Sequence, residues 1–73
     1  MENEIKTIME NILKVKVDIN SNRQNIDEWD SFNHLDILVS IEKKYDVSFS
    51  PEEMAEINSY EDLCRIVKSK INM

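Results

Sequence analysis

The sequence of 73 residues contains no glycine. Phosphate-binding loops, dinucleotide-binding fingerprints, EF-hand loops and nucleophile elbows all need glycine where the backbone turns sharply or approaches a ligand closely. Its absence excludes these motifs and disfavours tight β-hairpins. The single cysteine, Cys64, excludes an internal disulfide and a zinc cluster built from thiolates. We expect this thiol to be buried, free and inert, in a reducing compartment.

Long apolar runs and an excess of basic residues are also missing. No segment approaches the roughly 18 consecutive apolar residues that cross a bilayer, and residues 1–14 carry charges where a signal peptide would be apolar. Nine Lys and Arg face fifteen Asp and Glu, so the net charge is -6 and the pI is about 4.6. We therefore predict a cytoplasmic monomer without a membrane span and without a nucleic-acid partner, which would be repelled.

The negative charge is concentrated in residues 27–56. This stretch holds nine acidic and two basic residues, a net charge of -7, while the rest of the chain sums to +1. The bias predicts that an electropositive protein partner would be steered toward the central part of the chain. An acidic surface that serves solubility alone explains the same bias.

Periodic apolar positions predict an all-α fold. Residues 5–13 carry apolar side chains at the spacing of one helical stripe, and this first helix is expected to fade near Val17. Further helices are expected over residues 31–45, 51–57 and 60–71. Residues 46–50 alternate like a strand but have no partner strand, so they are interpreted as an extended connector. We expect one domain over residues 1–73, a small four-helix bundle with three longer helices, one short third helix and a long loop after the first.

Capping residues mark the expected helix starts. Asp30 is predicted to cap helix 31–45, which places Ser31 in the first turn. Ser50 begins a capping-box pattern, and Ser59 is expected to cap the last helix. Apolar residues cover so much of helix 31–45 that we expect several neighbours to pack around it. In the long loop, the expected anchors in the core are Ile19, Ile26 and Trp29.

Ser31, His34 and Asp30 are the residue types of a hydrolase, but their arrangement argues against one. All three fall within one helical turn, and nothing in the sequence suggests an oxyanion hole. One histidine and one cysteine without ligand spacing give no metal site. We therefore predict neither a catalytic residue nor a bound metal. A serine in the first turn of a helix does suit a phosphate ester, although a simple capping role explains the same position.

Several motifs together resemble the acyl carrier proteins. Asp30-Ser31-Phe32 stands where that family has Asp-Ser-Leu at the head of its second helix, and Asp46-Val47-Ser48-Phe49 and Pro51-Glu52-Glu53 match the step and the acidic short helix that follow. The resemblance covers nearly the whole chain. It implies that Ser31 receives 4'-phosphopantetheine from coenzyme A through a Mg²⁺-dependent phosphopantetheinyl transferase, and that Asp30 supports the modification. The thiol of the arm would carry acyl groups as thioesters between loading, condensing and acyl-transferring enzymes.

The resemblance also suggests roles for further residues. Partner enzymes are expected to contact the second helix at Phe32, Asp36 and Glu42. An acyl chain could be sheltered by a second group of side chains, for which ordinary core packing is the competing explanation. These candidate lining residues are Leu35, Val39, Tyr45, Phe49, Ile57 and Leu63.

The chain departs from the family pattern around its second helix. Trp29 stands where fatty-acid carriers usually have glycine, Phe32 replaces leucine, and Asn33 stands where an acid is frequent. Lys43 and Lys44 make the helix less negative than is typical. This favours a specialised pathway, such as lipopolysaccharide, capsule or secondary-metabolite assembly, with fatty-acid synthesis as the next candidate. A peptidyl or aminoacyl carrier of the same fold and an unmodified helical interaction module remain as alternatives.

Overall fold

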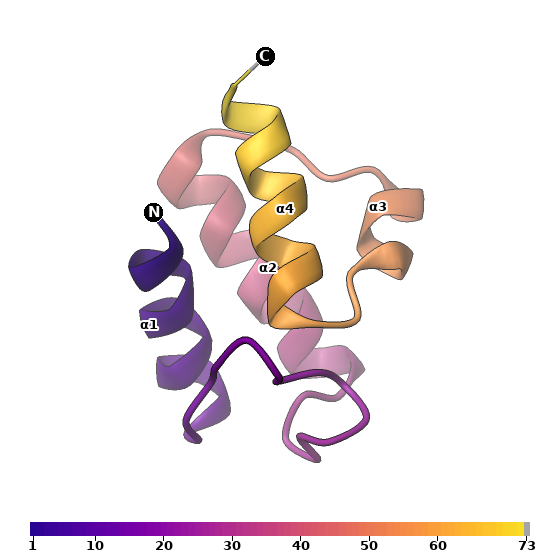
Figure 1. The fold of residues 1–73 in the computed structure, drawn as a ribbon. Coiled ribbons are helices and arrows are strands. Elements are labelled where there is room, and N and C mark those ends of the chain that lie inside the picture. Colours follow the sequence, from indigo (N-terminus) through magenta and orange to yellow (C-terminus); the bar gives the residue numbers. More distant parts are fainter. Residues whose placement is uncertain (73) are drawn as a thin grey trace.

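The computed structural model describes residues 1–72, which form four helices (Figure 1). They are α1 (Glu2–Leu13), α2 (Ser31–Tyr45), α3 (Pro51–Glu56) and α4 (Tyr60–Ile71). In this part of the chain, β pairing is limited to an isolated bridge between Asn22 and Ser59. The expected all-α fold, with three longer helices, a short third helix and a long loop after the first, is confirmed. Residue 73 of the expected domain lies outside the described residues.

The longer helices enclose the hydrophobic core, and α3 lies to one side of them (Figure 1). α1 packs on both α2 and α4. α3 has no fully buried residue, and its Met54 is only partly buried against the core. α3 is therefore held less by apolar burial than its neighbours are. The buried apolar residues are Ile5, Met9, Leu13, Val17, Ile26, Trp29, Ile37, Leu38, Ile41, Phe49, Ile57, Tyr60, Leu63, Cys64, Ile66 and Val67.

Three helices begin at the capping residues expected from the sequence. The Asp30 carboxylate accepts a hydrogen bond from the amide of Asn33 at 2.9 Å and begins α2. Ser50 forms the expected capping box at α3, and Ser59 accepts from the amide of Asp62 at 3.0 Å at α4. Among residues 1–72, no helix combines the length and the apolar character that crossing a membrane requires.

α1 ends four residues earlier than the apolar periodicity predicted. Its last residue is Leu13, and Lys14 adopts the left-handed conformation with φ 64° while its amide donates to the carbonyl of Glu10 at 2.8 Å. The Glu10 carboxylate then accepts from the amide of Val17 at 2.8 Å. This side-chain bond replaces the helical partner of Val17, so Val17 is buried as part of the loop rather than as helix.

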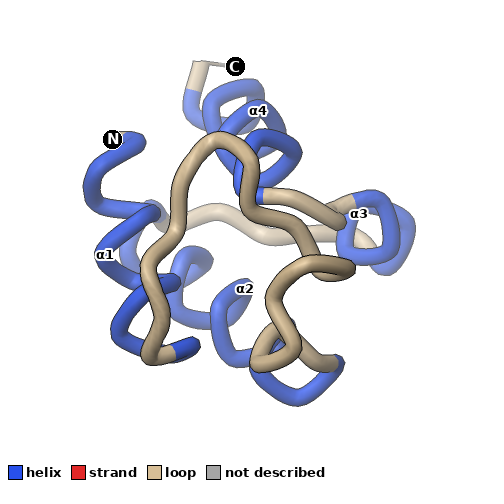
Figure 2. Tube along the Cα trace, turned by 60° about the horizontal axis from the view of Figure 1, so that its bottom comes forward, coloured by secondary structure: helices blue, strands red, loops and turns tan. Residues whose placement is uncertain are grey.

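The loop over residues 14–30 folds across the end of the bundle that contains the start of α4 (Figure 2). Ile26 and Trp29 anchor it in the core as expected, but Ile19 is 60% exposed and the expectation for it was wrong. The reason is a turn in which the amide of Ser21 donates to the carbonyl of Asp18 at 3.0 Å, which leaves Ile19 at the turn's outer side. The carbonyl of Ser21 accepts from the amide of Tyr60 at 3.0 Å and ties the loop to α4.

Candidate functional site

Ser31 is the first residue of α2 and is exposed to solvent. The residue before it, Asp30, caps the helix with its carboxylate, and its carbonyl accepts from the amide of His34 at 2.8 Å. The side-chain amide of Asn33 donates to the carbonyl of Glu28 at 2.8 Å. These bonds fix the backbone on both sides of the serine, so Ser31 lies on an exposed and well-ordered turn.

The start of α2 fits a phosphate group attached to Ser31. The first amides of a helix have no acceptor within the helix, and the helix dipole adds partial positive charge there. Asp30 satisfies the amide of Asn33, which leaves the amides of Ser31 and Phe32 without an acceptor inside α2. These two donors and the dipole favour an anionic ester at the serine. The residues present therefore suit a phosphate-linked group at this position.

His34, in the same turn, is buried and fully engaged in hydrogen bonds. Its Nδ1 accepts from the indole N–H of Trp29 at 3.0 Å. Because an indole N–H can only donate, the neutral ring carries its proton on Nε2, which donates to the carbonyl of Met54 in α3 at 2.9 Å. Burial is the main reason that the pKa of His34 lies below its usual value. His34 is therefore not available as a base for Ser31.

This role of His34 is not predicted by the sequence motifs. Trp29 is 2% exposed, and its buried indole N–H needs an acceptor, which was the available signal. The acceptor lies five residues further on, and the second partner of the imidazole, Met54, lies twenty residues away from it. Only the packing of α3 beside α2 brings the three residues together.

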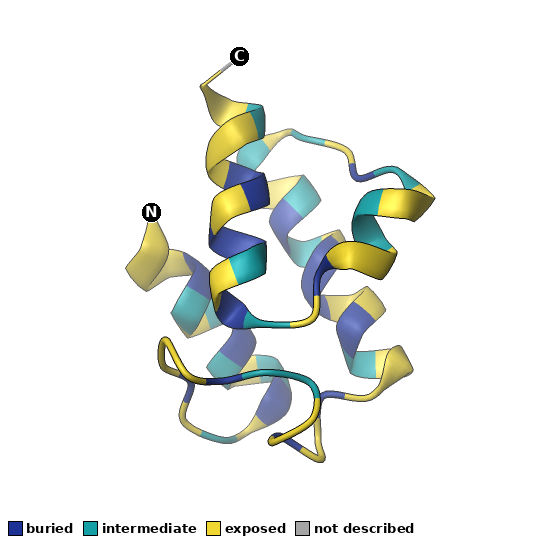
Figure 3. Ribbon diagram, turned by 45° about the vertical axis from the view of Figure 1, so that its right-hand side comes forward, coloured by how far each residue is buried: buried dark blue, intermediate teal, exposed yellow. Residues whose placement is uncertain are grey.

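α2 carries exposed as well as buried residues along its length (Figure 3), and three of the exposed ones are large and apolar. Phe32 is 84% exposed, Leu35 is 53% exposed and Val39 is 37% exposed. Together with Asp36 they line a shallow groove of about 320 Å³, here called the outward face of α2. The wide apolar arc expected for this helix is therefore covered only in part, because among the described residues the other helices and the long loop leave this face open.

The residues expected to contact partners differ in their surroundings. Phe32 and Asp36 lie in the groove of the outward face. Glu42 is half-buried, and its carboxylate accepts from the amide of Phe49 at 2.8 Å. Its backbone carbonyl also accepts from the amide of Val47 at 3.2 Å. Glu42 thus orders the connector that follows α2, whatever contacts it makes beyond the chain.

The six candidate chain-lining residues do not share one cavity among the described residues. Leu35 and Val39 belong to the outward face, while Phe49, Ile57 and Leu63 are buried in the core. Tyr45 is half-buried, and its hydroxyl donates to the Glu4 carboxylate at 2.8 Å. Burial and this bond raise the pKa of Tyr45 to about 12.

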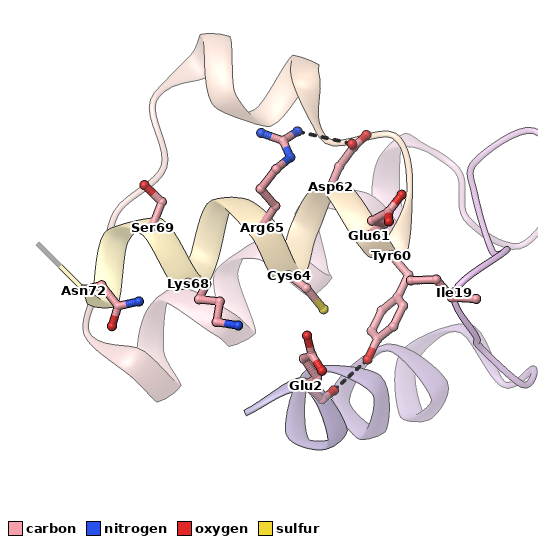
Figure 4. Close-up of a pocket in the computed structure, with 10 residues that line it drawn as sticks. All are labelled: Glu2, Ile19, Tyr60, Glu61, Asp62, Cys64, Arg65, Lys68, Ser69 and Asn72. Atoms are coloured by element: carbon pink, nitrogen blue, oxygen red, sulfur yellow. Dashed lines mark hydrogen bonds and ion pairs between the residues drawn. The ribbon is translucent and has the colours of Figure 1, made fainter.

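A larger open cavity of about 780 Å³ lies between α4, the start of α1 and the long loop (Figure 4). Arg65 pairs with Asp62 there at 3.2 Å, and the hydroxyl of Tyr60 donates to the carbonyl of Glu2 at 3.0 Å. Cys64 also borders the cavity, and it is buried and free as expected. Burial raises the pKa of its thiol, so the thiol stays protonated near neutral pH. Within residues 1–72, no group of three or more His, Cys, Asp or Glu residues is placed to hold a metal ion.

Comparison with protein families places most of the chain in a known kind of domain. Residues 3–67 match the family described as phosphopantetheine attachment site. The chain belongs to this family. It is a carrier domain that bears phosphopantetheine, and the carriers of this family are not catalytic. The resemblance inferred from the motifs is confirmed.

The carrier shares its fold with a solved member of the acyl carrier proteins. The solution NMR structure of holo acyl carrier protein from Geobacter metallireducens matches with a TM-score of 0.85 and 23% sequence identity. The match covers 97% of this chain and 85% of that chain. At this identity the likeness establishes the four-helix fold. A search of curated proteins found no match.

Proposed function

We propose that Ser31 is the attachment residue for 4'-phosphopantetheine and that Asp30 supports the modification. The observation that carries this assignment is the exposed position of Ser31 at the first residue of α2, inside the matched region. The cap formed by Asp30 holds the turn in place, and the helix start favours the phosphate. Once attached, the arm supplies a thiol that holds acyl groups as thioesters.

The carrier itself supplies only the attacking hydroxyl group in this reaction. In the transfer, Ser31 Oγ attacks the phosphorus that bears the pantetheine arm of coenzyme A, the phosphoanhydride bond breaks, and the adenosine bisphosphate leaves. The phosphopantetheinyl transferase supplies Mg²⁺ and the base, because His34 has both ring nitrogens engaged. The contribution of the carrier is to present an exposed hydroxyl on an ordered turn.

The outward face of α2 is the proposed docking surface for the transferase and for the enzymes that load and use the acyl group. Phe32 and Asp36 offer an apolar anchor beside a charge, one and five residues after Ser31. The excess of acids in residues 27–56 steers basic partner surfaces to the same region. Glu42 contributes to this negative field while it orders the connector.

The cargo is proposed to be an acyl group of a specialised pathway rather than of fatty-acid synthesis. The support is the mixed character of α2, which combines exposed apolar residues with Lys43 and Lys44 at its end. An acyl chain that enters the interior would have to separate Phe49, Ile57 and Leu63, which are now buried. Leu35 and Val39 could shelter a chain only along the outside.

Transfer of phosphopantetheine tests the assignment directly. The purified protein would be incubated with coenzyme A, Mg²⁺ and a broad-specificity transferase, and analysed by intact mass and peptide mapping. We expect one pantetheinyl addition on Ser31, none in Ser31→Ala, and an unchanged reaction in Ser48→Ala, whose exposed serine lies outside the helices. No addition to the folded, unmodified wild type, or addition to Ser31→Ala, would show that Ser31 is not the attachment residue.

A further inference from the structure

Two polar contacts hold α3 against the bundle. In its first half, the Glu53 carboxylate pairs with the Lys70 ammonium of α4 at 2.8 Å. In its second half, the carbonyl of Met54 accepts from His34 Nε2 at 2.9 Å. α3 itself has no fully buried residue, and its apolar attachment comes from the partly buried Met54 and from the buried flanking residues Phe49 and Ile57, so these two polar contacts add to a modest apolar contact.

The His34 contact belongs to a chain of hydrogen bonds at the start of α2. The indole N–H of Trp29 donates to His34 Nδ1, and His34 Nε2 donates to Met54. Trp29 directly precedes the capping residue Asp30, and His34 lies three residues after Ser31. One imidazole therefore connects the segment that leads into Ser31 with α3.

We propose that neutral His34 is a positioning residue that holds α3 against the Ser31 end of α2, and that its protonation releases α3. This inference rests on the proposed function, because its consequence is a surface beside the attachment residue that changes with pH. Loading enzymes and an arm attached to Ser31 would meet α3 in a different position when His34 is charged.

Protonation is incompatible with the observed bonds. An imidazolium carries protons on both nitrogens, so its Nδ1–H would face the indole N–H of Trp29 and neither group could accept. The groups around the ring also matter. Burial and the guanidinium of Arg23 in the long loop lower the pKa of His34, and the Met54 carbonyl of α3 raises it. The net effect is a lowered pKa, so the tied arrangement binds the proton more weakly than the released one.

The direction of the pH effect follows from this lowered pKa. The hydrogen bonds from Trp29 to His34 and from His34 to Met54, here called the tie, are fully present above the usual histidine pKa of about 6.5. They weaken as the pH falls below this value, because the released form binds the proton more readily. The Lys70 contact does not change over the same range. The hydrogen bond from Lys70 is the main cause that lowers the pKa of Glu53, so this carboxylate stays ionised.

Amide hydrogen exchange in α3 tests the proposal. The amides of Met54 and Ile57 are bonded within this helix, to Ser50 and Glu53, and report its opening. Exchange would be measured by NMR at about pH 7.5 and about pH 5.5, with correction for intrinsic rates. We expect protection at these amides to fall about tenfold at the lower pH while amides of α1 keep theirs. The chain has one His and one Trp, so the imidazole and indole signals report on this site alone.

Two substitutions separate the tie from general stability. His34→Gln can accept from the indole and donate to the carbonyl without titrating, so α3 should stay protected at both pH values. His34→Ala removes both bonds, and α3 should be poorly protected at both. Lys70→Gln is the matched control, because it weakens the other contact of α3 to an extent that does not depend on His34. If His34→Ala does not fold, the wild type and His34→Gln decide the question.

Equal protection of α3 at both pH values in the wild type would overturn the proposal, and so would an unchanged pH response in His34→Gln. Phosphopantetheine transfer to the wild type would be measured on the same preparations. If exchange follows His34 but transfer to Ser31 fails, the tie stands and the proposed function is wrong. If transfer succeeds and exchange in α3 does not depend on the protonation of His34, the proposed function stands and the proposed positioning role of His34 is wrong.

Discussion

The two faces of α2 carry similar side chains but have different surroundings. The inward face, formed by Ile37, Leu38 and Ile41, is exposed by 1% or less. The outward face leaves its phenylalanine, leucine and valine in contact with solvent. The difference in exposure comes from which elements pack against each face, not from the hydrophobicity of the side chains. α1 packs against α2 on the inward side, and within residues 1–72 no helix covers the groove on the other side.

This difference separates what folds the protein from what the protein presents. Burying a leucine or isoleucine side chain stabilises a fold by about 1.5–3 kcal/mol, and the outward face gives up much of that gain. Grouped apolar side chains on a surface usually mark a contact site. The groove begins one residue after Ser31. We infer that the inward face provides stability and that the outward face is kept for binding.

Ile41→Ala and Leu35→Ala compare the two faces directly and should give the largest difference. The first leaves a cavity in the core and should lower the free energy of unfolding by about 2–5 kcal/mol. The second removes a half-exposed side chain and should change it by less than about 0.5 kcal/mol. Urea denaturation followed by circular dichroism measures both. Similar losses in the two variants would show that the faces do not differ in the way the burial indicates.

Phe32→Ala tests the other half of the comparison. Phe32 is the most exposed apolar residue of the outward face, so its loss should leave the free energy of unfolding within about 0.5 kcal/mol of the wild type. As a docking anchor, it should lower kcat/KM for phosphopantetheine transfer about tenfold. Ile19→Ala removes an exposed apolar residue from the long loop and is the matched control. An equally slowed reaction in the Ile19→Ala control, or an unchanged kcat/KM in Phe32→Ala, would mean that the outward face does not guide the transferase.

The helices and the position of Ser31 could be predicted because the sequence patterns that indicate them are local. Asp30, Ser50 and Ser59 each bond to an amide three residues on, and such patterns can be read from neighbouring positions. The motif around Ser31 is equally local. The end of α1 was missed because it depends on the Glu10 carboxylate, which reaches the amide of Val17 seven residues further along.

Two further features that the sequence did not reveal depend on tertiary contacts. Periodicity showed that the apolar arc of α2 is wide, but which part of it is covered depends on where α1 and the long loop pack. The contact between His34 and Met54 joins residues twenty positions apart. Isoleucine is usually buried, and only the turn over residues 18–21 places Ile19 outside the core.

Substitutions of Asp30 separate positioning from charge at the start of the outward face. Asp30→Ala removes the cap and should cost about 1 kcal/mol of stability, whereas Asp30→Asn keeps an acceptor for the amide of Asn33 and should cost less. Transfer to Ser31 that slows only in Asp30→Ala would show that the cap positions the serine, and slowing in both would show that the charge matters. An unchanged unfolding free energy in Asp30→Ala would contradict the capping role.

Added salt should have the smallest effect on the free energy of unfolding. It compares two parts of the chain by their charge, where the earlier predictions compared the two faces of α2 by their side chains. Residues 27–56, which include all of α2 and α3, carry a net charge of -7, against +1 for the rest of the chain. Screening this repulsion between about 0.05 M and about 0.5 M NaCl should raise the free energy of unfolding by less than about 1 kcal/mol. Urea is the suitable denaturant because guanidinium is itself a salt.

Asp36→Asn removes one of these charges from the outward face without touching the core. The variant should be slightly more stable than the wild type at low salt and should respond less to added NaCl, because one source of repulsion is gone. Lys6→Gln, in the less charged part of the chain, is the matched control and should not reduce the salt response. If Asp36→Asn and the wild type respond equally to salt, the negative charge near Ser31 is dispersed enough to cost no stability, and its remaining physical role is the steering of basic partners.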